Sequence, residues 1–136
     1  MKILMDTNII LDTLASRKPF AGDAEKIFLL AAREEVEAYI SASSIADIYY
    51  ILRKYSSEDS SRQSIFRLCQ IFKVLPVSAA ECIDALESGI PDYEDALQEA
   101  CARGAHMDGI LTRDETFLKY SALALSPANF FARAGL

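Results

Sequence analysis

Short apolar runs alternate along this chain with longer stretches whose apolar residues recur at helical spacing. The longer stretches, such as 21–33, predict amphipathic helices. The short runs predict buried strands, and they lie at 2–5, 36–40, 74–77, 109–112 and 122–125. Strands and helices that alternate in this way build a parallel sheet with helices on both faces. The expected fold class is therefore α/β, a three-layer α/β/α sandwich with a mainly parallel sheet of four to five short strands.

The size of the chain limits how many such sandwiches it can hold. With 136 residues, 51% of them hydrophobic, it matches the commonest size of one domain. No linker or internal repeat divides the sequence, so we expect one domain over 1–136. The predicted helices fall at 21–33, 41–52, 65–72, 78–88, 92–104 and from Pro127 onward.

Charge and hydropathy exclude several classes of protein. The net charge of −6 argues against a protein that grips nucleic acid through global positive charge. The charge is unevenly distributed, with a basic segment at 53–80 followed by a very acidic one at 81–118. No apolar run approaches the roughly 20 residues of a bilayer span, and the apolar N-terminus is too brief for a signal peptide. We therefore expect no membrane segment and a cytoplasmic location.

Four aspartates occupy related positions in the predicted sandwich. Asp6 and Asp114 directly follow strands. Asp47 lies in the helix after the second strand, and Asp95 lies in the first turn of the helix before the fourth. Because sites in open α/β sheets lie outside the carboxyl ends of the strands, we expect these carboxylates to converge. Packed carboxylates repel one another unless a cation neutralises them, and oxygen ligands without histidine or thiolate indicate Mg²⁺ or Mn²⁺.

The sequence blocks that carry these acids resemble a known family. The blocks are Asp6-Thr7-Asn8, SASSIADIYYILRK around Asp47, PDYEDALQ around Asp95, and LTRD ending at Asp114. Together they resemble PIN-domain ribonucleases, and most nearly the VapC-type toxins of bacterial toxin–antitoxin pairs. The resemblance extends from the first residue to about residue 117.

This resemblance implies a Mg²⁺-dependent endoribonuclease built on a small parallel-sheet sandwich. The metal would polarise a phosphate oxygen and lower the pKa of a bound water toward ~7, so that no protein nucleophile is required. The sequence leaves open whether one metal or two take part. The products would carry 5′-phosphate and 3′-hydroxyl ends. The resemblance also implies a homodimer and a cognate antitoxin that supplies Arg or Lys to the acidic site.

The resemblance also assigns roles to individual residues. Asp6, Asp95 and Asp114 match acidic metal-site positions. Asp47 matches a catalytic position at which many relatives have Glu, so its carboxylate reaches one methylene less and would contact the metal through water. Asn8 would position Asp6 or a metal-bound water.

Further residues are candidates for support of the site or for contact with RNA. This set comprises Thr7, Thr112, Arg113, Arg53 and Lys54. Other polar residues have simpler interpretations. We expect Asp12 to be a solvated or capping acid, Asp92 to cap a helix, and the sole histidine, His106, to lie in an exposed turn.

Two functions of other classes remain open. A haloacid-dehalogenase-type phosphatase also begins with an Asp after its first strand, but it needs a second Asp two residues later, where this chain has Asn8. A non-catalytic interaction module would carry the same acids without chemistry. Cleavage of RNA that depends on Mg²⁺ separates the nuclease from both.

Overall fold

The strands form one sheet in which every neighbouring pair is parallel. A computed structural model describes all residues, 1–136, and places the strands in the order β3-β2-β1-β4-β5. Their bounds are β1 Lys2–Met5, β2 Glu37–Ser41, β3 Lys73–Leu75, β4 Gly109–Leu111 and β5 Ala124–Leu125. The five-stranded parallel sheet confirms the α/β fold class expected from the alternating pattern.

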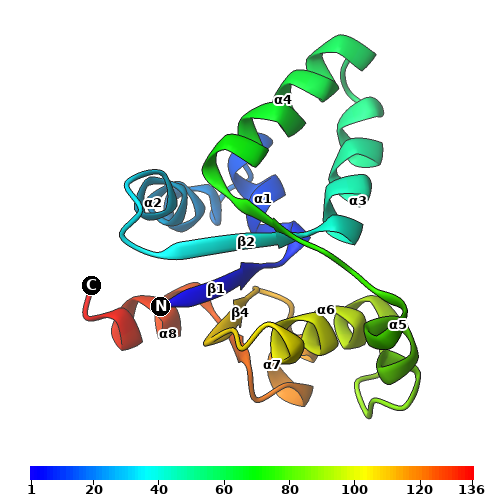
Figure 1. The fold of residues 1–136 in the computed structure, drawn as a ribbon. Helices are drawn as coiled ribbons and strands as arrows, with labels where there is room; N and C mark the ends of the chain where they lie inside the picture. The colour runs from blue at the N-terminus through cyan, green and yellow to red at the C-terminus, as the bar shows by residue number, and fades with distance from the viewer.

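Helices cover both faces of this sheet (Figure 1). Their bounds are α1 Thr7–Leu14, α2 Ala21–Ala32, α3 Ala42–Arg53, α4 Glu58–Ile71, α5 Ala79–Leu86, α6 Tyr93–Gly104, α7 Glu115–Tyr120 and α8 Pro127–Ala134. Helices α1 to α4 lie on one side of the sheet, and α5, α6 and α7 lie on the other. None of the helices combines the length and the apolar character that a membrane span needs.

The side chains of the strands are buried in two separate hydrophobic cores, because successive residues of a strand point to opposite faces of the sheet. In β1, Ile3 and Met5 are buried against α1, α2 and α3, whereas Leu4 is buried against α5 and α6. In β4, Leu111 belongs to the first core and Ile110 to the second. This alternation produces the three layers.

Two helices were not predicted from the sequence, and both begin directly after a candidate site acid. Asp6 is the N-cap of α1, and Asp114 is the N-cap of α7. These helices have only eight and six residues, and neither carries the capping box of α5 or the N-terminal proline of α8, which mark two other eight-residue helices in the sequence. The remaining predicted helices and strands are present, with bounds that differ by a few residues at most, except that α4 begins at Glu58 rather than near residue 65.

The order of the strands fixes where a site can form. From β1 the chain proceeds outward through β2 to β3, and it then crosses by α5 and α6 to β4 on the other side of β1. The direction of winding therefore reverses between β1 and β4. Crevices at the carboxyl ends of strands at such a reversal are the usual ligand sites of open α/β sheets. Asp6 lies there, and its backbone N–H donates to the carbonyl of Leu111 at 2.9 Å.

Candidate active site

The carboxylate of Asp6 is held by four donors at the end of β1. Its Oδ1 accepts from the backbone N–H of Thr7 at 2.7 Å and from Nε2 of Gln98 at 2.8 Å. Its Oδ2 accepts from Oγ1 of Thr112 at 2.7 Å and from Nδ2 of Asn8 at 3.2 Å. Asp6 is only 7% exposed. The donors come from α1, α6 and the end of β4, so the fold fixes the orientation of this carboxylate.

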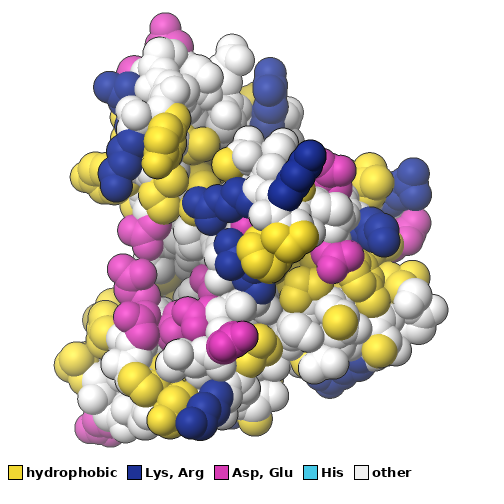
Figure 2. Space-filling model, turned by 180° about the vertical axis from the view of Figure 1, so that it is seen from behind, with side chains coloured by type: hydrophobic (Ala, Val, Ile, Leu, Met, Phe, Trp, Pro, Cys, Tyr) yellow, Lys and Arg dark blue, Asp and Glu magenta, His cyan; other side chains and the backbone are white.

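Acids from three distant segments line one cleft beside Asp6. The cleft has a volume of about 490 Å³, and its lining includes Asp6, Asp47 of α3, and Glu94 and Asp95 of α6. Figure 2 shows Asp and Glu side chains gathered in a hollow between the part of the molecule built by α3 and α4 and the part built by α5 and α6. The expected convergence of Asp6, Asp47 and Asp95 is therefore observed.

Asp95 experiences the strongest electrostatic conflict in this cleft. Burial raises the pKa of its carboxyl from the ordinary 3.8 to about 7, and the negative charges of Asp6, Asp92, Asp114 and Glu94 contribute to the rise. No hydrogen bond to its side chain offsets these effects, although the backbone N–H of Asp95 donates to Asp92. The carboxylate is thus poorly compensated in the protein alone.

Glu94 is a cleft residue that the sequence reasoning missed. The charge of Asp47, followed by burial and the charges of Asp92 and Asp6, raises the pKa of Glu94. The signal was present in the sequence, since Glu94 adjoins Asp95 in the PDYEDALQ block. Gln98 was also missed, and it follows Glu94 by one helical turn on the same face of α6.

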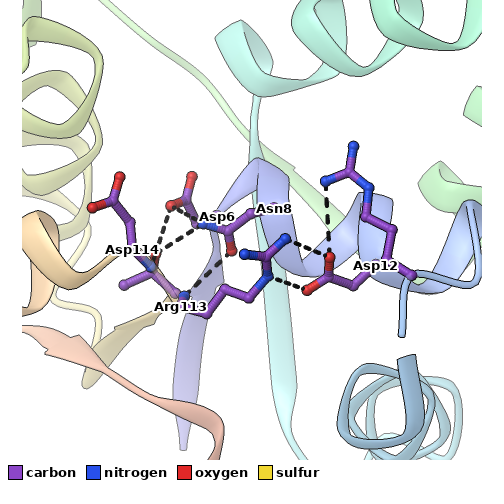
Figure 3. A network of polar contacts seen from close by, with 7 residues as sticks. Asp6, Asn8, Asp12, Arg113 and Asp114 are labelled. Atoms are coloured by element: carbon purple, nitrogen blue, oxygen red, sulfur yellow. Dashed lines mark hydrogen bonds and ion pairs between the residues drawn. The ribbon is translucent and has the colours of Figure 1, made fainter. Parts of the chain in front are cut away.

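Asp114 lies beside Asp6 but outside the lining of the cleft. Figure 3 shows the two carboxylates next to each other and pointing the same way. Asp114 is exposed, and its Oδ1 accepts from the backbone N–H groups of Thr116 and Phe117 at 2.9 and 3.3 Å. Its own N–H donates to Oγ1 of Thr112 at 3.0 Å. Asp114 is therefore both a helix cap and a neighbour of the acids.

The expectation that Asp12 is a solvated or capping acid is wrong. Its side chain is 1% exposed, and it accepts from Nε and Nη2 of Arg113 at 2.7 and 3.0 Å. Arg17 lies 3.8 Å from the same carboxylate, and the guanidinium of Arg113 stacks 3.9 Å from the centre of the Phe20 ring. The backbone N–H of Arg113 donates to Oδ1 of Asn8 in the site. Its guanidinium binds Asp12 and so holds the β4–α7 connection against α1 (Figure 3).

The two basic residues at the end of α3 differ in their surroundings. Arg53 lies 3.3 Å from Glu58 and donates from Nη1 to the carbonyl of Ser56 at 2.7 Å. Lys54 is exposed, and it follows the cleft residue Tyr50 by one helical turn, so it lies on the cleft side of α3. Of this pair, Lys54 is the better placed for a ligand in the cleft.

The remaining polar residues behave as expected. Asp92 is the N-cap of α6, with Oδ2 accepting from the N–H of Asp95 at 3.1 Å. His106 is exposed in the turn after α6 and does not line the cleft.

The donors of the cleft fit a hard divalent cation. All its ionisable side chains except tyrosines are carboxylates, and Oε1 of the buried Gln98 has no hydrogen-bond partner. As the side chains stand, no three acids, histidines or cysteines are grouped closely enough to hold an ion. Oxygen donors and uncompensated negative charge nevertheless suit Mg²⁺ or Mn²⁺.

A second hollow, of about 730 Å³, lies between α5 and α6. It is also acidic, with Glu81, Asp84, Glu87 and Glu99 in its lining, and Arg103 pairs with Glu99 at 3.1 Å. None of its lining residues lies at the carboxyl end of β1 or β4, and no unpartnered buried polar atom belongs to the lining. The cleft beside Asp6 is therefore the candidate site.

Several solved structures share this fold. The Rickettsia felis VapBC2 complex bound to a DNA fragment from its promoter has a chain with a TM-score of 0.69 and 17% identity, over 93% of this chain and 98% of that one. A toxin–antitoxin complex from Klebsiella pneumoniae gives a TM-score of 0.69 and 20% identity, over 92% and 97%. VapC20 of Mycobacterium tuberculosis, a toxin that cleaves the sarcin–ricin loop, gives 0.69 and 17%, over 86% and 93%.

Sequence comparison identifies the family directly. No curated protein matches the sequence significantly. A family model described as the PIN domain matches residues 2–116, which include every acid of the cleft and Asp114. This match covers most of the chain, and it agrees with the fold of the solved structures and with the resemblance of the sequence blocks. The chain therefore belongs to the PIN domain family.

Proposed function

We propose that this protein is a Mg²⁺- or Mn²⁺-dependent endoribonuclease that hydrolyses phosphodiester bonds of RNA. The observation that carries the proposal is the convergence of Asp6, Asp47, Glu94 and Asp95 on one cleft at the winding reversal of the sheet. An uncompensated acidic cleft repels a phosphodiester, so substrate binding there requires a cation.

Asp6 and Asp95 would hold the cation, with Asp114 beside them. When bound, the cation would polarise the scissile phosphate and lower the pKa of the attacking water. The chain itself keeps Asp6 oriented through Asn8 and Thr112. Products with 5′-phosphate and 3′-hydroxyl ends are expected, because water rather than the ribose 2′-hydroxyl attacks.

The rim of the cleft suits a flexible nucleic acid. Tyr50 and Tyr93 line it and are 69% and 43% exposed, so their rings are available to stack on unpaired bases. Lys54, on the same side of α3, is placed to contact a phosphate. These residues favour single-stranded RNA as the substrate.

The phosphatase alternative lacks a catalytic acid. A general acid would be needed two residues after Asp6, and this position is occupied by the amide of Asn8. Nδ2 of Asn8 donates both to Asp6 and to Oγ1 of Thr112 at 3.2 Å. This arrangement supports an orienting role for Asn8 and gives no group that could protonate a leaving group.

We also propose that the protein acts in the cytoplasm as the toxin of a toxin–antitoxin pair. The support is the shared fold with toxin–antitoxin complexes and the charge of the cleft. A cognate antitoxin that places Arg or Lys into the cleft would neutralise the acids and block the cation site. Co-purification from the native operon without any small partner would count against this assignment.

We propose that the protein forms a homodimer, and helices α3 and α4 carry exposed apolar side chains that a second copy could bury. Phe66 of α4 is 65% exposed and lines an apolar hollow between α3 and α4 together with Ile45 and Ile65. Sedimentation velocity on the wild type and on Phe66→Glu tests the proposal, with a dimer expected for the wild type and a shift toward monomer for the variant. A wild type that sediments as a monomer at all concentrations would refute it.

The test of the nuclease is cleavage of unstructured RNA by the purified protein with Mg²⁺, with EDTA, and with Asp6→Asn and Asp95→Asn. We expect EDTA to abolish cleavage and either variant to reduce the rate at least ~100-fold, since the lost charge removes several kcal/mol of transition-state stabilisation. The exposed Asp84→Asn is the matched control and keeps the wild-type rate. Equal rates in all variants would refute the assignment, and hydrolysis of a phosphate monoester through an aspartyl phosphate would favour the phosphatase.

A further inference from the structure

Gln98 is a buried neutral side chain that lines the cleft and forms a hydrogen bond with Asp6. It lies on α6, one helical turn after Asp95, and it is 5% exposed. Its Nε2 donates to Oδ1 of Asp6 at 2.8 Å, although the two residues are 92 positions apart in the chain. Its other polar atom, Oε1, has no hydrogen-bond partner.

The contact with Asp6 determines which way the amide of Gln98 points. A flipped amide would place Oε1 against Oδ1 of Asp6, and two acceptors repel each other, so Nε2 must face the carboxylate. The carbonyl Oε1 is thereby directed away from Asp6. Only one other buried side-chain atom in the chain, Oγ1 of Thr13, lacks a partner, and Thr13 does not line the cleft.

An unpaired buried acceptor is costly to the folded protein, and the residue that carries this one lines the polar cleft, from which a donor can come. No side chain of the cleft donates to this atom in the structure, including the hydroxyl groups of its lining, and the neighbouring Asp6 and Glu94 are acceptors when ionised. A water molecule that hydrates a cation is a strong donor, because the charge of the cation polarises its O–H bonds.

We propose that Gln98 is a positioning residue for the divalent cation. It orients Asp6 through Nε2, and through Oε1 it accepts from a water of the cation's hydration shell. This inference rests on the proposed metal dependence of the site. The inference names Oε1 of Gln98 as the acceptor for a cation-bound water. It also explains why this buried position holds a glutamine rather than an apolar residue.

The test compares Mn²⁺ binding to the full-length wild type, Gln98→Met and the control Gln63→Met by isothermal titration calorimetry. Methionine keeps the length and the apolar volume of glutamine but removes both polar atoms. Gln63 is an exposed glutamine of α4, so its replacement makes the same chemical change away from the cleft. We expect Gln98→Met to weaken Mn²⁺ binding about 10-fold or more, as loss of groups that orient metal ligands usually does, and Gln63→Met to leave it unchanged.

Thermal unfolding in EDTA separates this role from a structural one. Gln98→Met loses the bond to Asp6 but also removes the unpaired Oε1, so we expect its melting temperature in EDTA to stay near that of the wild type. The stabilisation of the variant by added Mn²⁺ should be smaller than that of the wild type. A variant that melts much earlier in EDTA and then binds Mn²⁺ with wild-type affinity would assign Gln98 a purely structural role and overturn the proposal.

A measurement on the wild type does not depend on the folding of the variant. The NMR chemical shifts of the side-chain amide protons of Gln98 should change as Mg²⁺ is added. The Mg²⁺ concentration at the midpoint of this change should match the Kd of the protein for Mg²⁺. Absence of a shift in a protein that binds Mg²⁺ would overturn the role of Gln98 alone. A wild type that binds neither Mg²⁺ nor Mn²⁺ would overturn both this role and the proposed function.

Discussion

Replacing Asp95 with asparagine is expected to stabilise the protein in the absence of divalent cations. Burial and the neighbouring acids raise the pKa of Asp95 from 3.8 to about 7, so ionisation of this carboxyl opposes folding. Asparagine has nearly the same shape and carries no charge. The variant should therefore lose the electrostatic cost that the wild-type site bears when it is empty of cations.

The magnitude follows from the pKa. At about 1.4 kcal/mol for each pH unit, a rise from 3.8 to about 7 amounts to an upper limit of about 4 kcal/mol. The buried amide must also give up its water, so we expect a net gain of roughly 1–3 kcal/mol for Asp95→Asn at pH 8. Because the raised pKa means that the folded state binds the proton more tightly, the wild type loses stability as the pH rises from about 4 through about 7. The gain of the variant should grow over this same range and then level off.

The assay is urea unfolding in EDTA between pH 5 and pH 8, with the exposed Asp84→Asn of α5 as control for the general loss of one negative charge. Repeating it with Mg²⁺ should reverse the order, since a cation that binds only the folded wild type adds stability by mass action. A variant no more stable than the wild type in EDTA at pH 8, or an equal gain for Asp84→Asn, would refute the electrostatic account of the cleft.

Two further predictions concern the residues that hold the site together. Asp12→Ala should lower the free energy of unfolding by about 3 kcal/mol in urea titrations, because it leaves Arg113 without its partner in a largely buried ion pair. A decrease below about 0.5 kcal/mol would show that the ion pair contributes little to stability. Thr112→Val removes the 2.7 Å hydrogen bond to Asp6, and it should reduce RNA cleavage at saturating Mg²⁺ by about 10-fold. Thr112→Ser, which keeps the hydroxyl, should retain most of the rate, and equal losses in both variants would contradict the role of this bond.

The sheet could be predicted from the sequence because strand periodicity and burial act locally. The apolar run 2–5 corresponds to β1 residue for residue, since Ile3, Leu4 and Met5 are all buried in a central strand. Helices α1 and α7 escaped prediction for a local reason as well. Each is short, and each directly follows an aspartate whose role as a helix cap cannot be told, in the sequence alone, from a role in the site.

The meeting of Asp6, Asp47 and Asp95 at one cleft could be predicted, but Glu94 and the contacts that arrange these acids could not. The position of Asp6 after a strand suffices to place it at the carboxyl edge of the sheet. The hydrogen-bond partners of Asp6 and Asp12 could not be predicted, because Gln98 and Arg113 lie 92 and 101 positions away from them in the chain. Such pairs depend on the crossover from β3 to β4, and no local pattern encodes this crossover. For this reason Asp12 looked like a solvated acid although it is almost fully buried.

The central claim is that acids from distant segments share one divalent cation, and anomalous diffraction from crystals soaked in Mn²⁺ tests it most directly. We predict a single region of anomalous density in the cleft, within ligand distance of Asp6 and Asp95, and its loss in crystals of Asp6→Asn. Density confined to other surface acids, or a cleft that stays empty of Mn²⁺ at millimolar concentration, would contradict the account.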